Sequence, residues 1–333
     1  MIIQRNISFD LIRVLATFMV ILIHTFGSYV VNDSALGSVE WTIANLIDSF
    51  CRPSVPLFFM ISGALLLRKD YTIQFFFKNR FVRILIPFIF WSIIYSLVNR
   101  HVLNDEGFVI GKFIKDIFYG SSIHLWFVYT LFGLYLLVPL IATRFSTFSN
   151  VYWRYFFGLW ALTLFISFSN FSIYLPKIEL TYFSGYLGYF LLGYYLTLKK
   201  NTLKFSILLF VGGVIITFIG TQILSYRSGA FEHGFYNYLT INVAISAIGL
   251  FGILSDIKIH NSTIKKIIIQ ESKNSYGIYL IHMLILTLLM DASFASYFQN
   301  HIFRLTAIAV ICYMMSSIIV NILKRIPGIK SLV

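Results

Sequence analysis

Long apolar segments separated by short polar ones make up nearly the whole hydropathy pattern of the chain. Ten of these segments are long enough to cross a bilayer as helices, which rise about 1.5 Å per residue. The pattern therefore predicts an all-α fold, a polytopic transmembrane helical bundle in which residues 1–333 form one membrane domain. The predicted spans are 9–31, 43–67, 81–99, 124–141, 152–169, 180–198, 203–224, 235–254, 275–290 and 302–323.

Composition agrees with a membrane protein and excludes several other classes. Of the residues, 58% are hydrophobic and 12% charged, with a mean hydropathy of +0.82, whereas soluble domains have roughly 25% charged residues. The net charge of +13 comes from short basic clusters between the spans, so we do not expect nucleic acid as a partner. Cys51 and Cys312 lie in different apolar segments, so neither a disulfide nor a metal site is expected.

The distribution of lysine and arginine predicts the orientation of the bundle. Eighteen of the 26 basic residues fall on the N-terminus and on alternate connecting segments, six fall on the opposite set, and Arg13 and Arg52 lie within spans. Cytoplasmic loops carry the excess of lysine and arginine in membrane proteins. Both termini are therefore predicted to be cytoplasmic.

The first span carries three ionisable residues, Asp10, Arg13 and His24, among apolar neighbours. Arg13 and His24 are eleven residues apart, so both face one side of a helix with about 16 Å between them along its axis. Ionisable groups at membrane depth are costly and usually functional. The alternative is structural: Arg13 extends to the headgroups and pairs with Asp10, while His24 is a neutral core histidine.

The second span is interrupted by the segment Cys51–Pro56, in which two prolines remove backbone donors and should kink or break the helix. Arg52 lies within this segment and is a candidate site residue, although a position near the outer edge would let it simply meet water. Ser62 and Gly63 follow the kink; they are either part of a site or a place of close helix packing.

The segment Tyr71–Arg83 mixes aromatic and basic residues and predicts an amphipathic interfacial helix that continues into the third span. Arg80 and Arg83 are three residues apart, so on a regular helix they share a face and could clamp a phosphate, with Lys78 beside them. The alternative is that these cations only anchor the topology.

Two further pairs of polar aromatic side chains complete the candidates. His124 and Trp126 begin the fourth span, where they are expected at the outer interface. Tyr279 and His282 are three residues apart in the ninth span, on one face of a short helix. A lone histidine of this kind is more often structural than catalytic.

In order along the chain, five short motifs resemble those of acyltransferase family 3, membrane-bound bacterial enzymes of which many O-acetylate cell-surface polysaccharides. The motifs are Asp10-Leu11-Ile12-Arg13 with His24, Phe58-Phe59-Met60-Ile61-Ser62-Gly63, Arg80-Phe81-Val82-Arg83 with Pro87 and Trp91, His124-Leu125-Trp126-Phe127, and Ser275-Tyr276-Gly277-Ile278-Tyr279-Leu280-Ile281-His282. The resemblance covers the whole chain. Val14 departs from it, because the family usually has glycine there.

The resemblance implies a protein of the bacterial cytoplasmic membrane that takes acyl-CoA, most often acetyl-CoA, from the cytoplasm. The acyl group would pass to a cell-surface or lipid-linked glycan, with no permanently bound cofactor. By match to the motifs, His24 is similar to the catalytic base and Arg13, near Asp10, to its companion. Arg80 and Arg83, with Lys78, are similar to the donor-binding residues. Substrate-lining positions would be Arg52, Ser62, His124, Trp126, Tyr279 and His282.

Elementary chemistry agrees with these roles. Histidine, with an unperturbed pKa of about 6.5, suits the removal of a hydroxyl proton near neutral pH, and arginines suit the phosphates of CoA. Whether the acyl group first joins the protein is left open. The alternative function is a secondary transporter or flippase for a lipid-linked or anionic solute, since intramembrane charges and a proline-broken helix also occur there. Inverted repeats would favour that alternative, and the sequence shows none.

Overall fold

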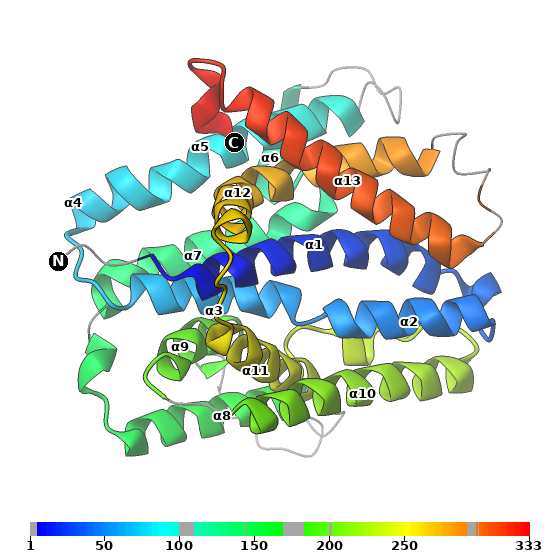
Figure 1. The fold of residues 1–333 in the computed structure, drawn as a ribbon, viewed down its shortest axis with the longest axis horizontal. Helices are drawn as coiled ribbons and strands as arrows, with labels where there is room; N and C mark the ends of the chain where they lie inside the picture. The colour runs from blue at the N-terminus through cyan, green and yellow to red at the C-terminus, as the bar shows by residue number, and fades with distance from the viewer. Residues whose placement is uncertain are drawn as a thin grey trace.

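The computed structural model describes residues 5–99, 110–142, 144–168, 183–199, 202–291, 298 and 300–333. Every regular element in these residues is helical (Figure 1). The α-helices are α1 Ile7–Val30, α2 Val39–Cys51, α3 Ser54–Leu66, α4 Ile73–Phe76, α5 Val82–Val98, α6 Ile110–Tyr119, α7 Trp126–Ile141, α8 Asn150–Phe168, α9 Leu187–Leu196, α10 Leu203–Ser228, α11 Ile241–Asp256, α12 Ser262–Asp291 and α13 His301–Leu323.

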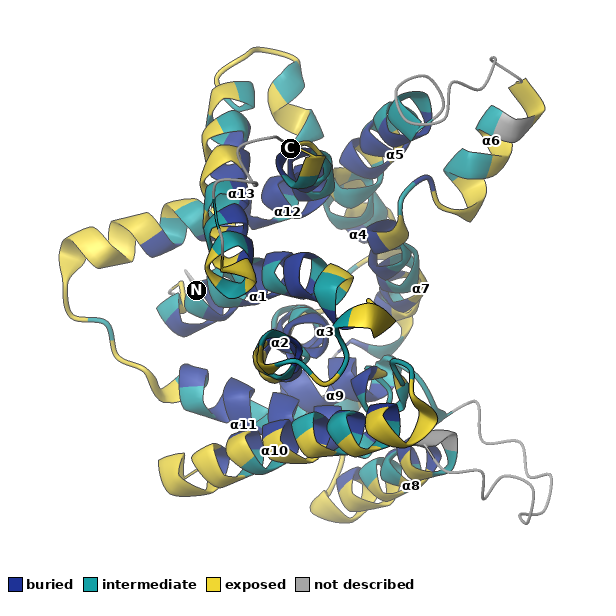
Figure 2. Cartoon of the chain, turned by 90° about the vertical axis from the view of Figure 1, so that its right-hand side faces the viewer, coloured by how far each residue is buried: buried dark blue, intermediate teal, exposed yellow. Residues whose placement is uncertain are grey.

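Helix α1 is the centre of the bundle. It packs against α2, α3, α11, α12 and α13, and the end-on view places it inside a ring of helices whose outer faces are exposed (Figure 2). Its N-terminus is capped by the Asn6 side chain, which accepts a hydrogen bond from the Ser8 backbone N–H at 2.9 Å. Polar side chains on α1 are therefore surrounded mainly by the other helices of the protein.

The described residues contain eight helical segments that are long and apolar enough to cross a membrane. This confirms a polytopic helical bundle. Two of the ten predicted spans are not among the eight: 152–169 corresponds to α8, and 180–198 to α9, which has only ten residues. Residues 169 and 180–182 lie outside the described residues. The number ten and the orientation stay predictions.

Two boundaries test the hydropathy pattern directly. The predicted break in the second span is confirmed, because α2 ends at Cys51 and α3 begins at Ser54. The predicted ninth span was too short: α12 starts at Ser262 rather than near 275 and has 30 residues. The first turns of α12 are helical but carry charged residues such as Lys265 and Lys266. The hydropathy pattern detects only the apolar stretch that follows them.

Close packing of α3 on α9 depends on two glycines. A Cβ atom at Gly63 would lie 1.7 Å from the Phe190 carbonyl oxygen, and one at Gly193 would lie 1.9 Å from the Met60 carbonyl oxygen. Both contacts are with backbone, which cannot rotate away. The packing interpretation of Gly63 is therefore confirmed.

We expect Gly63→Leu to disrupt this packing, since overpacking a tight interface costs about 1–3 kcal/mol or more. The measurement is the loss of the folded peak on size exclusion after heating in detergent. Gly212→Ala is the control, because a Cβ there meets nothing within 4 Å. An unchanged thermal profile for Gly63→Leu would contradict the packing shown by the structure.

The orientation can be tested with single cysteines at exposed positions. Ser34 and Gly229 are predicted outside the cell, and Lys69 and Thr263 inside; all four are exposed, so the protein itself does not shield them. Cysteines at 34 and 229 should react with an impermeant thiol reagent in intact cells, and those at 69 and 263 only after lysis. Labelling of position 69 from outside would reverse the predicted orientation.

Candidate active site

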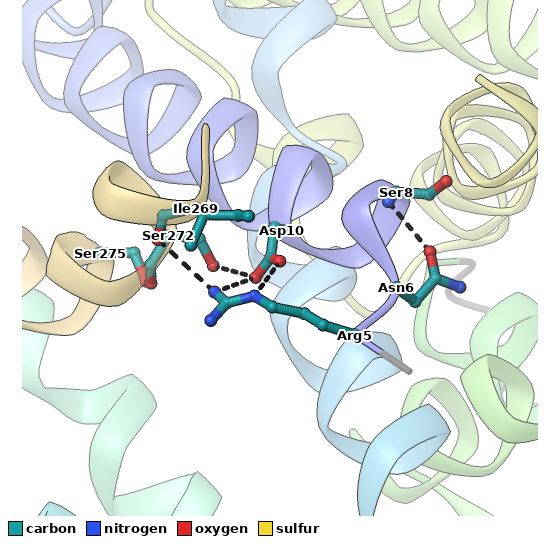
Figure 3. Close-up of polar contacts among 7 residues, drawn as sticks. All are labelled: Arg5, Asn6, Ser8, Asp10, Ile269, Ser272 and Ser275. Atoms are coloured by element: carbon teal, nitrogen blue, oxygen red, sulfur yellow. Dashed lines mark hydrogen bonds and ion pairs between the residues drawn. The ribbon is translucent and has the colours of Figure 1, made fainter. Parts of the chain in front are cut away.

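Asp10 anchors the start of α1 and does not pair with Arg13. Arg5 Nε lies 2.6 Å from Asp10 Oδ2, and the Ser272 hydroxyl donates to Oδ1 at 2.6 Å, which ties α1 to α12 (Figure 3). The hydrogen bond to Asp10 raises the pKa of Arg5. Among the described residues Asp10 makes its ion pair with Arg5 and none with Arg13, so the alternative in which Arg13 pairs with Asp10 is not what the structure shows. The contacts of Asp10 are those of an anchor.

Arg13 instead faces a group of polar side chains from three other helical segments. It lies within electrostatic range of Tyr135 on α7 and of Arg80, and Ser62 neighbours the Tyr135 hydroxyl. We call Arg13, Ser62, Arg80 and Tyr135 the inner cluster. Tyr71 borders it: burial raises the pKa of Tyr71, and the nearby Arg80 opposes that shift. Two cations thus lie within electrostatic range of each other and of Tyr135.

The basic segment before α5 does not present its cations on one face. Arg80 lies in a π-helical segment, Phe77–Phe81, and is partly buried, whereas Lys78 and Arg83 are exposed. The expectation that Arg80 and Arg83 share a face assumed regular α-helical spacing, which a π-helical turn changes. The structure places Arg80 within electrostatic range of Arg13 and leaves the other two cations exposed.

Three histidines from distant parts of the sequence meet beside α1. The ring centroid of His24 lies 5.5 Å from that of His282 and 6.4 Å from that of His124, and His124 lies 5.0 Å from His282. We call these three residues the histidine cluster. His124 is 2% exposed: the short turn Ile123–Leu125 lies ahead of α7 with the His124 side chain inside the bundle. Its place at the outer interface stays a prediction.

Hydrogen bonds fix two members of the histidine cluster. His282 Nδ1 donates to the Tyr279 carbonyl oxygen at 2.6 Å, which leaves Nε2 of the neutral ring as an acceptor. His124 Nδ1 lies 2.9 Å from the Ser122 hydroxyl, and the Tyr279 hydroxyl donates to the His124 carbonyl. Neither Nε2 has a hydrogen-bond partner among the described residues. Tyr279 and His282 share one side of α12, as predicted.

His24 differs from the other two because it is partly exposed, while His124 and His282 are buried. It is the least buried member of the histidine cluster. Histidine clusters can bind metal ions. Within the described ranges, however, no group of three His, Cys, Asp or Glu side chains has the arrangement to hold a metal ion.

A cavity of about 320 Å³ opens next to the C-terminal end of α1; we call it the outer pocket. Arg52 borders it and is only 12% exposed; its Nη2 lies 2.5 Å from Asp48 Oδ1, and its guanidinium lies 4.0 Å from the ring centroid of Tyr236. Arg52 therefore does not simply meet water. The pocket is lined by Gly27, Val30, Val31, Asp48, Arg52, Phe231, His233, Tyr236, Asn237 and Tyr238.

Trp126 connects the outer pocket to the start of α7. Its ring stacks on that of Tyr238, with centroids 5.8 Å apart, and it also contacts Tyr186 at 5.4 Å. Of the site-lining positions expected from the sequence, Arg52 lies at the outer pocket, Trp126 lines a separate cavity and contacts Tyr238 of the outer pocket, His124, Tyr279 and His282 lie in or beside the histidine cluster, and Ser62 lies in the inner cluster. From its N-terminus to its C-terminus, α1 therefore borders first the inner cluster, then the histidine cluster and then the outer pocket.

Sequence reasoning missed three residues of this arrangement. Asp48 precedes Arg52 by four residues, a helical ion-pair spacing that a search for i,i+4 pairs would have found. Tyr135 and Tyr236 gave no such signal, because each is one aromatic among many in a chain with 21 tyrosines. Their place is determined by tertiary packing.

Comparison with known proteins gives one match. The model of a protein family described as an acyltransferase domain matches residues 6–325, nearly the whole chain. No curated protein and no solved structure matches. The matched residues include those of the inner cluster, the histidine cluster and the outer pocket.

Proposed function

Since the chain belongs to the acyltransferase 3 family, we propose that it transfers an acetyl group from acetyl-CoA to a hydroxyl group of a cell-surface or lipid-linked glycan. One observation carries the proposal: partly exposed His24 lies on α1 between a cationic cluster and an open pocket. A donor and an acceptor could thus approach one histidine from opposite ends of the same helix.

The donor would bind at the inner end. Arg13 and Arg80 supply fixed positive charge, and exposed Lys78 and Arg83 add to the local field that attracts the phosphates of CoA. Arg13 lies about 16 Å from His24 along the helix axis, so the extended arm of CoA would carry the thioester from the cations toward the histidine. This is the reason to assign donor binding to this end.

His24 would act as the general base. It accepts the proton of the acceptor hydroxyl while the oxygen attacks the thioester carbonyl carbon, forming the ester C–O bond. The C–S bond then breaks, and the CoA thiolate leaves with the electron pair and takes up the proton from His24. The rings of His282 and His124, each held by its own hydrogen bond, pack beside the ring of His24 and would limit its movement. This sequence needs no acyl-enzyme.

Purified protein in lipid vesicles, incubated with labelled acetyl-CoA and extracted surface glycan or its lipid-linked precursor, tests the proposal. Label covalently attached to the glycan supports transfer. Label that enters the vesicles without becoming attached would favour the transporter alternative, and no movement of label to the glycan would contradict the proposed enzyme.

A further inference from the structure

The geometry points to the outer pocket as the binding site of the acceptor, and to a neutral sugar whose hydroxyl is oriented by the Arg52–Asp48 pair as the unit bound there. The inference rests on the proposed function. It adds the place where the acceptor binds and the charge class of the acceptor.

Position favours this pocket over the others. Gly27 borders it one turn after His24, about 4.5 Å further along the helix axis. Arg52 is also close enough to His24 to interact with it electrostatically. Two larger cavities, of about 500 and 610 Å³, take no lining residue from α1. A volume of about 320 Å³ is at the lower end of the range of small-molecule sites, roughly 300–1,000 Å³.

Unsatisfied polar atoms indicate what the pocket would bind. Asp48 is fully buried; one of its carboxylate oxygens takes the Arg52 guanidinium, and Oδ2 receives no hydrogen bond from any described residue. Arg52 Nε is likewise unpartnered. A hydroxyl group donates one hydrogen bond and accepts others. It can therefore serve a carboxylate and a guanidinium at once, which an anionic group cannot.

Gly27 keeps the space beside Asp48 open. A Cβ atom at this position would lie 3.4 Å from Asp48 Oδ2, and no other heavy atom lies within 4 Å of it. Gly27 also lines the outer pocket, so a larger side chain at position 27 should reduce the space beside Asp48. This gives a substitution that tests the proposed site.

The charge of the site selects a neutral sugar. Asp48 neutralises Arg52, so the pair attracts neither anions nor cations strongly, and an acidic sugar would meet the free oxygen of Asp48. The rest of the lining supplies what carbohydrates use: the aromatic side chains of Tyr236 and Tyr238 and the polar groups of Asn237 and His233. A lipid phosphate or an acidic glycan fits this lining poorly.

The test is acceptor kinetics in the lipid-reconstituted protein. Extracted surface glycan is hydrolysed to oligosaccharides and separated by anion exchange into neutral and acidic fractions, and each is offered with labelled acetyl-CoA. We expect label in the neutral fraction. Gly27→Leu and Arg52→Gln should each raise the KM for the neutral fraction about tenfold or more, while the KM for acetyl-CoA changes less than about twofold.

Each outcome decides one question. If wild type labels neither fraction, the proposed function fails. If wild type labels only acidic fragments, or if both variants keep the acceptor KM of wild type, the acceptor site is wrong while the enzyme stands. Should Gly27→Leu not fold, Gly27→Ala, with a small Cβ in contact with Asp48 Oδ2, replaces it, and Arg52→Lys should recover only part of the acceptor affinity. Gly212→Ala is the folding control.

Discussion

His24→Gln should lower the single-turnover rate of acetyl transfer by about 10²–10⁴, the usual contribution of a general base. Glutamine keeps the approximate size and the hydrogen bonding of histidine but does not accept a proton at neutral pH. If His24 were only a core side chain, glutamine would replace much of its role. The rate is measured at saturating acetyl-CoA with extracted glycan, and a size-exclusion profile confirms folding.

The matched control is His260→Gln, since His260 is exposed between α11 and α12 and belongs to none of the three polar regions along α1. It should keep the wild-type rate. The wild-type rate should also fall on acidification, because protonated His24 has no lone pair to take the hydroxyl proton. A well-folded His24→Gln protein within about threefold of wild type would remove His24 as the base, and His124 or His282 would be tested next.

The part of the site on α1 could be predicted from the sequence because one helix determines it. The eleven-residue spacing of Arg13 and His24 fixes their side of α1 wherever the helix lies. The break near Pro53 was predictable for the same local reason, since proline removes a backbone donor. Local rules were sufficient for features that depend on the residues of a single segment.

The partners of these residues could not be predicted, because they come from elsewhere in the chain. Asp10 has two candidate arginines nearby, and the choice of Arg5 follows from the place of Ser272 on α12. His124 and His282 are 158 residues apart in sequence and meet only through tertiary packing, which brings the turn Ile123–Leu125 beside α12. The π-helical turn before Arg83 is likewise invisible to a pattern based on 3.6 residues per turn.

Arg80→Ala should weaken acetyl-CoA binding by about tenfold to a hundredfold, the loss expected for one charge-assisted hydrogen bond of roughly 1.5–3 kcal/mol. Arg80 is partly buried and within electrostatic range of Arg13, at the end where the phosphates are proposed to bind, whereas Arg83 is exposed. Arg83→Ala should therefore change the dissociation constant by less than about threefold, because exposed charges contribute little individually. The structure therefore predicts different losses of affinity for the two variants, whereas the sequence pattern predicts similar losses.

The measurement is equilibrium binding of labelled acetyl-CoA to each variant in a His24→Gln background, which prevents turnover during the titration. Arg83→Ala is the matched control, because it removes the same side chain three residues away on the same segment. Arg80→Lys should recover only part of the affinity, since an ammonium group lacks the fork of the guanidinium. Equal losses in Arg80→Ala and Arg83→Ala would support a two-arginine clamp instead, and no loss in either would leave both residues as topological anchors.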